Sequence, residues 1–160
     1  ASITGSNFTE WYNPSEGTLI SQSTMPLDRI IPGSFRSFAQ IVKSSSYNSD
    51  SIFQYINSGN SYPASEARVS NSNVFGITSG NTYFLGCKIA TAYAAANYAI
   101  SSAGVAPVTN SYNGVPNDLD KLCIGNVNDN NSLGCVNGTI SQLTYYPTRL
   151  PNAQLQTLTK

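Results

Sequence analysis

Side-chain catalysis near neutral pH depends most often on histidine, and this chain of 160 residues contains none. Without an imidazole, the Ser-His-Asp and Cys-His nucleophile arrangements are excluded, and so are His-ligated zinc and iron sites. The sequence also has no glycine-rich loop of the kind that cradles phosphates. These absences remove most of the common enzyme classes.

Glycoside hydrolysis needs only two carboxylates, so the lack of histidine does not exclude it. Of the eight acidic residues, only Asp118 and Asp120 stand two positions apart, as a pair on one strand face would. The segment 117–120 is typical of a turn before a strand, where an Asp caps the turn or is solvated. We therefore expect a protein that is not an enzyme.

The residues of this chain fit sugar binding better than they fit catalysis. A pyranose ring presents a C–H patch that stacks on an aromatic ring and a fringe of hydroxyls that bond amide groups. Residues of both kinds stand in predicted loops: Tyr47, Asn48, Tyr62, Tyr112 and Asn113. If two of these loops lie at the same end of the molecule, Tyr62, Tyr112 and Asn113 would form a ledge for a sugar ring. The alternative is that each loop tyrosine packs over the end of the domain with its hydroxyl in water.

The sequence offers few ligands for a metal ion and no clear disulfide pattern. The segment Asn128-Asp129-Asn130 offers oxygen ligands for Ca²⁺, but it supplies only one carboxylate, and Ca²⁺ sites usually have more. A polar turn is therefore favoured, and no cofactor is expected. The three cysteines, Cys87, Cys123 and Cys135, show no Cys-x-x-Cys spacing. One bridge between Cys123 and Cys135 stays open, although three reduced cysteines that pack as small hydrophobes are favoured.

Composition limits the partners. Charged residues make up 10% of the chain, against the usual ~25%, and the net charge is zero. Polarity comes instead from 23 Ser and 18 Asn. The sequence has no basic stripe that would bind nucleic acid and no apolar run of the ~20 residues that a membrane span requires. The chain starts at Ala1 without a signal-peptide pattern, so we expect a single domain over residues 1–160 that belongs to a longer protein.

The elements that must position these residues are strands. Short β-branched and aromatic runs alternate with clusters of Asn, Gly, Ser and Pro, a pattern typical of a sandwich or barrel, and helical spacing occurs only at 152–158. The predicted strands are Gly17–Ser21, Ser34–Val42, Ser51–Ile56, Ala67–Ser70, Val74–Thr78, Thr82–Tyr93, Asn97–Ser101, Lys121–Gly125 and Gly134–Tyr146. The predicted loops are Lys43–Asp50, Asn57–Ser65, Val105–Asp120 and Asn126–Ser132.

Three stretches resemble concanavalin A-like, laminin G-like jelly-roll domains. Residues 136–158 give a turn, a strand that stops at Pro147 and a short helix, and they resemble the last strand and helix of those domains. Residues 8–19 are similar to their opening strand. Residues 88–100, followed by Leu122-Cys-Ile-Gly125, resemble their central hairpin and the strand after it. Two departures, Pro151 for a Ser N-cap and Gln154 for a Glu, remove the usual capping box.

The resemblance implies an all-β protein, an antiparallel β-sandwich of jelly-roll type with a short C-terminal helix. We expect the C-terminal strand to lie inside a sheet and the helix to lie at the edge of that sheet. The residues expected to be mostly buried are Trp11, Ile89, Ala92, Ile100, Leu122, Ile124, Ile140, Leu143 and Tyr145.

The amino-acid sequence of residues 145–158 is similar to the C-terminal end of such a domain on large bacteriophage virion proteins. That resemblance implies a lectin-like module on the virion surface, assembled in the bacterial host cytoplasm, that binds a host-surface glycan during adsorption. It also implies a homotrimer. The alternative is a structural appendage or a capsid- or tail-decorating domain that contacts other virion proteins and binds no glycan.

Overall fold

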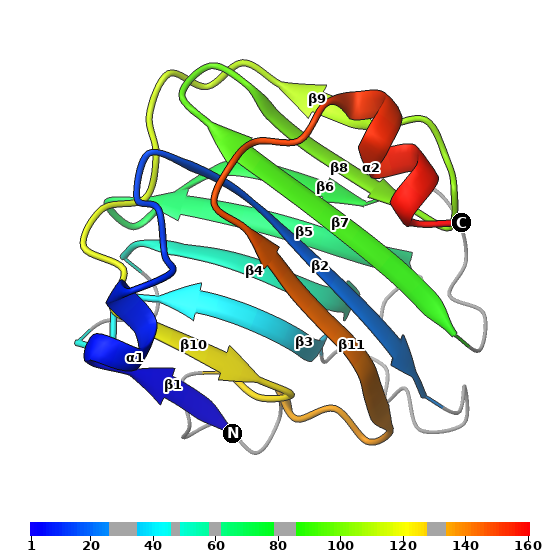
Figure 1. The fold of residues 1–160 in the computed structure, drawn as a ribbon, viewed down its shortest axis with the longest axis horizontal. Helices are drawn as coiled ribbons and strands as arrows, with labels where there is room; N and C mark the ends of the chain where they lie inside the picture. The colour runs from blue at the N-terminus through cyan, green and yellow to red at the C-terminus, as the bar shows by residue number, and fades with distance from the viewer. Residues whose placement is uncertain (26–34, 46–48, 58–61, 79–85, 128–133) are drawn as a thin grey trace.

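The computed structural model describes residues 1–25, 35–45, 49–57, 62–78, 86–127 and 134–160. Two antiparallel sheets pack face to face in a β-sandwich, which confirms the predicted fold class (Figure 1). Sheet A has the strand order β1 (Ser2–Thr4), β10 (Lys121–Ile124), β3 (Phe35–Val42), β4 (Ser51–Asn57), β5 (Tyr62–Val69) and β6 (Ser72–Thr78). Sheet B has the order β11 (Thr139–Tyr146), β2 (Glu16–Thr24), β7 (Cys87–Ala94), β8 (Tyr98–Ser102) and β9 (Val108–Asn110).

Two short helices complete the fold: α1 (Ser6–Thr9), between β1 and β2, and α2 (Asn152–Leu158), at the C-terminal end. Neither helix is long and apolar enough to cross a membrane, and no other helix occurs in the described part of the chain. The prediction of a helix at 152–158 is confirmed.

Side-chain alternation along the strands builds the core. On β4, Ile52 and Ile56 are fully buried between the sheets, whereas Tyr55 faces the other side of sheet A. On β7, Ile89 and Tyr93 point into the same core. These two strands therefore each have one face in the core, as the period of two requires.

The outer face of sheet B is lined by small residues and covered by α2. Ala90, Ala92 and Ala99 lie on this face and form a second buried cluster with Leu155 of α2. Because a methyl group takes little room, the helix can lie close over β7 and β8 (Figure 1). The C-terminal helix thus packs on the alanine-rich hairpin formed by β7 and β8.

The prediction that the C-terminal strand lies inside a sheet is wrong. β11 is the edge strand of sheet B and pairs only with β2, while α2 packs on the sheet face and not at its edge. An edge strand keeps one side open, so β11 is only partly buried. This explains why Ile140, Leu143 and Tyr145 are half-buried and not mostly buried as predicted.

The burial prediction is confirmed for four residues of the interior: Ile89, Ala92, Ile100 and Leu122 are buried. It is wrong for Trp11, in the connection after α1, and for Ile124, the last residue of β10. Both are half-buried because they pack against the core from its rim.

The predicted strands exist, but several boundaries differ. β1, α1 and β9 were not predicted, because three or four residues carry too little periodicity to stand out. The predicted loop 57–65 is wrong from Tyr62 onward, where β5 begins. Pro63 pairs with Ile56 of β4, and among the described residues the pairing of β5 with β6 begins at Ala64.

A polar cluster joins the two sheets at the centre of the core. The amide of Gln54 donates to the Leu19 carbonyl (2.9 Å) and to the Thr91 hydroxyl (2.8 Å). Ser21 donates to the Gln54 carbonyl oxygen (2.8 Å), and Thr91 donates to the Ser65 hydroxyl (2.9 Å). The four side chains are buried and bond one another across the sheets, so the polar groups are satisfied without water.

We predict that Gln54→Leu destabilises the protein by about 2–4 kcal/mol, because Ser21 and Thr91 lose buried partners while the volume is nearly kept. Urea denaturation followed by circular dichroism measures this. The matched control is Gln142→Leu on exposed β11, which should change the free energy of unfolding by less than about 0.5 kcal/mol. Equal effects of the two substitutions would show that the cluster adds no stability.

Candidate functional site

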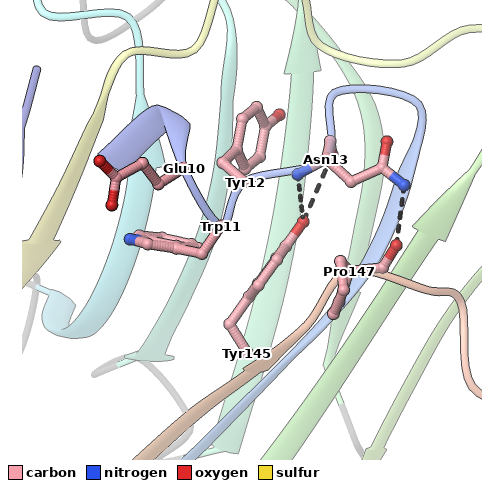
Figure 2. A pocket seen from close by; sticks show the side chains of 6 residues that line it. All are labelled: Glu10, Trp11, Tyr12, Asn13, Tyr145 and Pro147. Atoms are coloured by element: carbon pink, nitrogen blue, oxygen red, sulfur yellow. Dashed lines mark hydrogen bonds between the residues drawn. The ribbon is translucent and has the colours of Figure 1, made fainter. Parts of the chain in front are cut away.

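A pocket of about 460 Å³ opens at the end of the sandwich where β2 begins and β11 ends (Figure 2). The chain after α1 forms one side of the pocket, and the end of β11 with the residue after it forms the other. Its lining is mostly aromatic: Glu10, Trp11, Tyr12, Asn13, Tyr145 and Pro147.

Two tyrosine hydroxyls hold the backbone of Asn13 and so fix this wall of the pocket. Tyr93 of β7 donates to the Asn13 carbonyl (2.8 Å), and the Asn13 N–H donates to the Tyr145 hydroxyl (3.0 Å). The two hydroxyls also bond each other (2.7 Å). One consistent arrangement has Tyr145 as the donor in that bond, because the Tyr93 proton then serves Asn13. The segment after α1 is thereby tied to both β7 and β11.

The side chain of Asn13 is committed to the fold. Its amide nitrogen donates to the Pro147 carbonyl (2.7 Å), and its oxygen accepts the Ser15 N–H (3.0 Å), which shapes the turn into β2 (Figure 2). Asn13 lines the pocket, but its hydrogen-bonding capacity is largely used within the protein.

The aromatic rings are packed in fixed positions. Trp11 lies edge-on to Phe8 and edge-on to Tyr145, with ring centroids 4.9 Å apart in both pairs. Tyr12 stacks on Phe8 at 4.7 Å, and Phe8 is fully buried. The indole N–H of Trp11 donates to the Asn7 carbonyl (2.6 Å). Trp11 therefore offers a ligand its ring surface and not its N–H group.

Burial sets the protonation state of the phenols. It raises the pKa of Tyr12, Tyr93 and Tyr145 above the ordinary value of about 10, so all three are neutral near pH 7. The Tyr12 hydroxyl is buried and makes no hydrogen bond of ordinary geometry with any residue that the structure describes. No phenolate is available as a base.

Among the described residues, Glu10 is the one charged residue that lines the pocket. Its side chain is exposed, and it makes no ion pair or hydrogen bond with the described residues. The pocket thus combines rigid aromatic surface with a single uncommitted carboxylate.

Two of the sequence-predicted site residues lie at this end of the molecule. Tyr112 is 40% exposed, and Asn113 is exposed beside it, in the loop after β9. The Tyr112 carbonyl accepts the Ala96 N–H (2.8 Å), which places this loop next to the β7–β8 turn. Neither residue lines the pocket.

Tyr62 lies at the opposite end. Phe75 contacts Tyr98 (ring centroids 5.1 Å) near the β7–β8 turn, and Phe75 pairs with Ala67 of β5. Tyr62 stands five residues earlier on β5, about 16 Å further along the strand. The proposed ledge of Tyr62, Tyr112 and Asn113 is therefore not assembled, and ligand binding by any one of them stays a prediction.

Other predicted positions fall outside the described residues: Tyr47 and Asn48, and the segment Asn128–Asn130 considered for Ca²⁺. The described residues contain no group of three or more His, Cys, Asp or Glu side chains that could hold a metal ion. The three cysteines form no disulfide in the structure.

A second polar and aromatic cluster lies on the outer face of sheet A. Phe53 and Tyr55 stack at 4.6 Å, and the Glu66 carboxylate, 12% exposed, accepts from the Arg68 guanidinium and from the Tyr55 hydroxyl (3.4 Å). Burial and the nearby Glu66 charge raise the pKa of Tyr55 to about 12. The spacings Phe-x-Tyr and Glu-x-Arg on paired strands could have revealed this face from the sequence. Because these groups bond one another, the pocket at the end of the sandwich is the stronger ligand site.

Sequence reasoning assigned Trp11 to packing and did not single out Glu10 or Tyr145 as site residues. The local signal was weak: one acid before an aromatic pair. Tyr145 meets this segment only because β11 pairs with β2, which no local pattern reveals.

No protein-family model matches this chain, and no curated protein matches it. Solved structures do. The CBM40 module of a Ruminococcus gnavus IT-sialidase superposes with a TM-score of 0.72 at 13% identity, over 92% of this chain and 84% of the module. The same module bound to α2,3-sialyllactose gives a TM-score of 0.70.

Two further matches come from animals. A SAP-like pentraxin of Limulus polyphemus matches with a TM-score of 0.68 at 14% identity, over 94% of this chain and 73% of the pentraxin. Domains LG4-5 of the mouse laminin α1 chain match with a TM-score of 0.66 at 8% identity, over 94% and 40%. The chain has the jelly-roll β-sandwich fold of these domains. The predicted resemblance to such domains is confirmed at the level of fold, and these matches do not address a virion.

We predict that Gly17→Ala destabilises the protein by about 1–3 kcal/mol. A Cβ at Gly17 would lie 2.6 Å from the Tyr145 hydroxyl and 2.7 Å from the Tyr93 hydroxyl, and both are held by Asn13. Thermal and urea unfolding measure the loss. Gly76→Ala is the matched control, since its nearest neighbour is the flexible amide of Asn73 at 3.0 Å. A Gly17 variant as stable as the control would mean that the tyrosines can shift freely.

We also predict alkaline destabilisation. A buried tyrosine with a raised pKa keeps its proton in the folded state and loses it first in the unfolded state. Its contribution is therefore complete below about pH 10 and falls as the pH rises further. Denaturant unfolding at a series of pH values, with tyrosinate absorbance, measures the slope. Tyr93→Phe should make that slope shallower, and an unchanged slope would contradict the assignment.

Proposed function

We propose that this chain is a non-enzymatic, lectin-like module that binds a glycan in the pocket lined by Trp11, Tyr145 and Glu10. The observation that carries the proposal is the pocket itself: aromatic surface held rigid by the bonds between Tyr93, Tyr145 and Asn13, beside a carboxylate with no partner among the described residues.

The chemistry of a sugar ring fits this lining. Its C–H face packs on an aromatic ring, and its hydroxyls donate to a carboxylate. The volume of about 460 Å³ lies in the ordinary range for small-ligand sites, ~300–1,000 Å³. Because Trp11 and Tyr145 are already packed against each other, little side-chain entropy is lost when a ligand binds.

The fold supports the proposal by analogy. The R. gnavus module of the same fold has been solved with α2,3- and α2,6-sialyllactose. At 13% identity this is an argument from architecture, so the residues of the pocket carry the proposal.

Binding without catalysis is favoured by the acid inventory of the pocket. Glycoside hydrolysis uses two carboxylates, one as acid and one as base or nucleophile. In the part of the chain that the structure describes, Glu10 is the only carboxylate that lines this pocket. Measurable hydrolysis of a bound oligosaccharide would contradict this part of the proposal.

The setting of the module rests on the resemblance of residues 145–158 to the C-terminal ends of phage virion proteins. In this proposal the module stands on the virion surface as part of a homotrimer and binds a host-surface glycan during adsorption. The competing role is a decorating domain that contacts only other virion proteins.

The test is glycan-array and whole-cell binding by the protein, followed by titration of the glycan that binds. Trp11 is the only tryptophan, so its fluorescence reports directly on the pocket. We expect Trp11→Ala, which has no tryptophan and is therefore titrated by calorimetry, to weaken binding by about tenfold, the typical loss of 1–2 kcal/mol for an aromatic contact. Trp11→Phe should retain more of the packing against Phe8 and Tyr145 and separates a folding defect from a binding defect.

Tyr112→Ala is the matched control, because Tyr112 is an exposed tyrosine at the same end but outside the pocket. It should leave binding and melting temperature unchanged. Loss of binding in Tyr112→Ala with normal binding in Trp11→Ala would move the site to the loop after β9. A domain that binds no glycan and no cells would support the decorating role.

A further inference from the structure

We infer that the pocket selects a glycan with a positively charged group, an amino sugar with a free amine. This inference rests on the proposed function of the pocket as a sugar site, and it names the class of sugar that fits. The carrying observation is the charge balance of the lining, which among the described residues has one carboxylate and no basic side chain.

Polar recognition in the pocket depends on Glu10. The Asn13 amide is occupied by Pro147 and Ser15, and the Trp11 N–H by Asn7. A carboxylate only accepts hydrogen bonds, and its strongest partners are cationic N–H donors. A sugar ammonium therefore gains more from Glu10 than a neutral hydroxyl does.

The charges next to the pocket do not neutralise Glu10. Glu16, whose charge acts on Tyr145, accepts the backbone N–H of Arg149 (2.9 Å). The Arg149 guanidinium donates to the Leu150 carbonyl and to the Asn152 side chain, both at 2.6 Å, away from the residues that line the pocket. No basic side chain among the described residues makes an ion pair with Glu10.

The aromatic lining adds to the attraction. The rings of Trp11, Tyr12 and Tyr145 carry a negative face that attracts an ammonium group, and Trp is the strongest of the three ring types. The phenols are neutral, so this attraction comes from the ring faces, and the full charge comes from Glu10.

The negative charge of Glu10 also disfavours the binding of acidic sugars. A sialic acid carboxylate would face Glu10, with no Arg or Lys side chain in the lining to pair with it. The pocket should therefore reject sialyllactose, the ligand found with the R. gnavus module of the same fold.

The experiment compares three probes by Trp11 fluorescence at about pH 6. The probes are a glucosamine oligomer, the N-acetylglucosamine oligomer of equal length, and α2,3-sialyllactose. We expect the glucosamine oligomer to bind about tenfold more tightly than its acetylated counterpart and to weaken as salt is added, and we expect no binding of sialyllactose.

Glu10→Gln should abolish the preference for the free amine and leave the weaker, salt-independent binding of the acetylated oligomer. Asp118→Asn is the control, because it removes an exposed negative charge, paired with Lys43, that lies outside the pocket. It should keep the preference.

The outcomes separate the two proposals. Equal binding of the two oligomers, unaffected by Glu10→Gln, overturns the inference and leaves the sugar site in place. Tight binding of sialyllactose overturns it as well. If none of the probes binds and the glycan array is also blank, the proposed function fails together with the inference.

Discussion

Two tyrosine hydroxyls on the backbone of Asn13 hold together the end of this molecule where the pocket opens. Tyr93 stands on a central strand of sheet B and Tyr145 on its edge strand, and both reach the segment that links α1 to β2. Gly17 makes the approach possible, since any Cβ there would collide with both hydroxyls. The position of Trp11, and with it the shape of the pocket, depends on these bonds.

The two outer faces of the sandwich are used differently. Sheet B presents alanines, and α2 covers them with Leu155. Sheet A presents Tyr55, Glu66 and Arg68, which bond one another. With one face covered by the chain's own helix and the other engaged in its own contacts, the end of the sandwich is where ring surface and an uncommitted acid meet.

Low charge is a theme of the whole chain. Hydrogen bonds among Gln54, Ser21 and Thr91 join the two sheets in the core. Hydrogen bonds between tyrosine hydroxyls and Asn13 fix the wall of the pocket. All of these bonds join neutral groups. Such bonds are short in range and directional, which suits the fixing of geometry. In a protein with so few charges, a single uncommitted carboxylate such as Glu10 dominates the field around it.

The sequence by itself determined the class of fold and most of its strands, the hairpin at 94–97 and the C-terminal helix, because turn residues and alternation are local properties. It also determined that histidine chemistry is absent. Only the tertiary structure decided that β11 is an edge strand, that Pro63 lies within β5, and that Tyr62 and Tyr112 lie at opposite ends. It alone brought Tyr145 to Asn13, 132 positions away in the chain. The alternation of apolar and polar side chains along a strand depends only on residues that are neighbours in the sequence. The order in which strands pair depends on how all the buried faces pack together, which no local stretch of sequence determines.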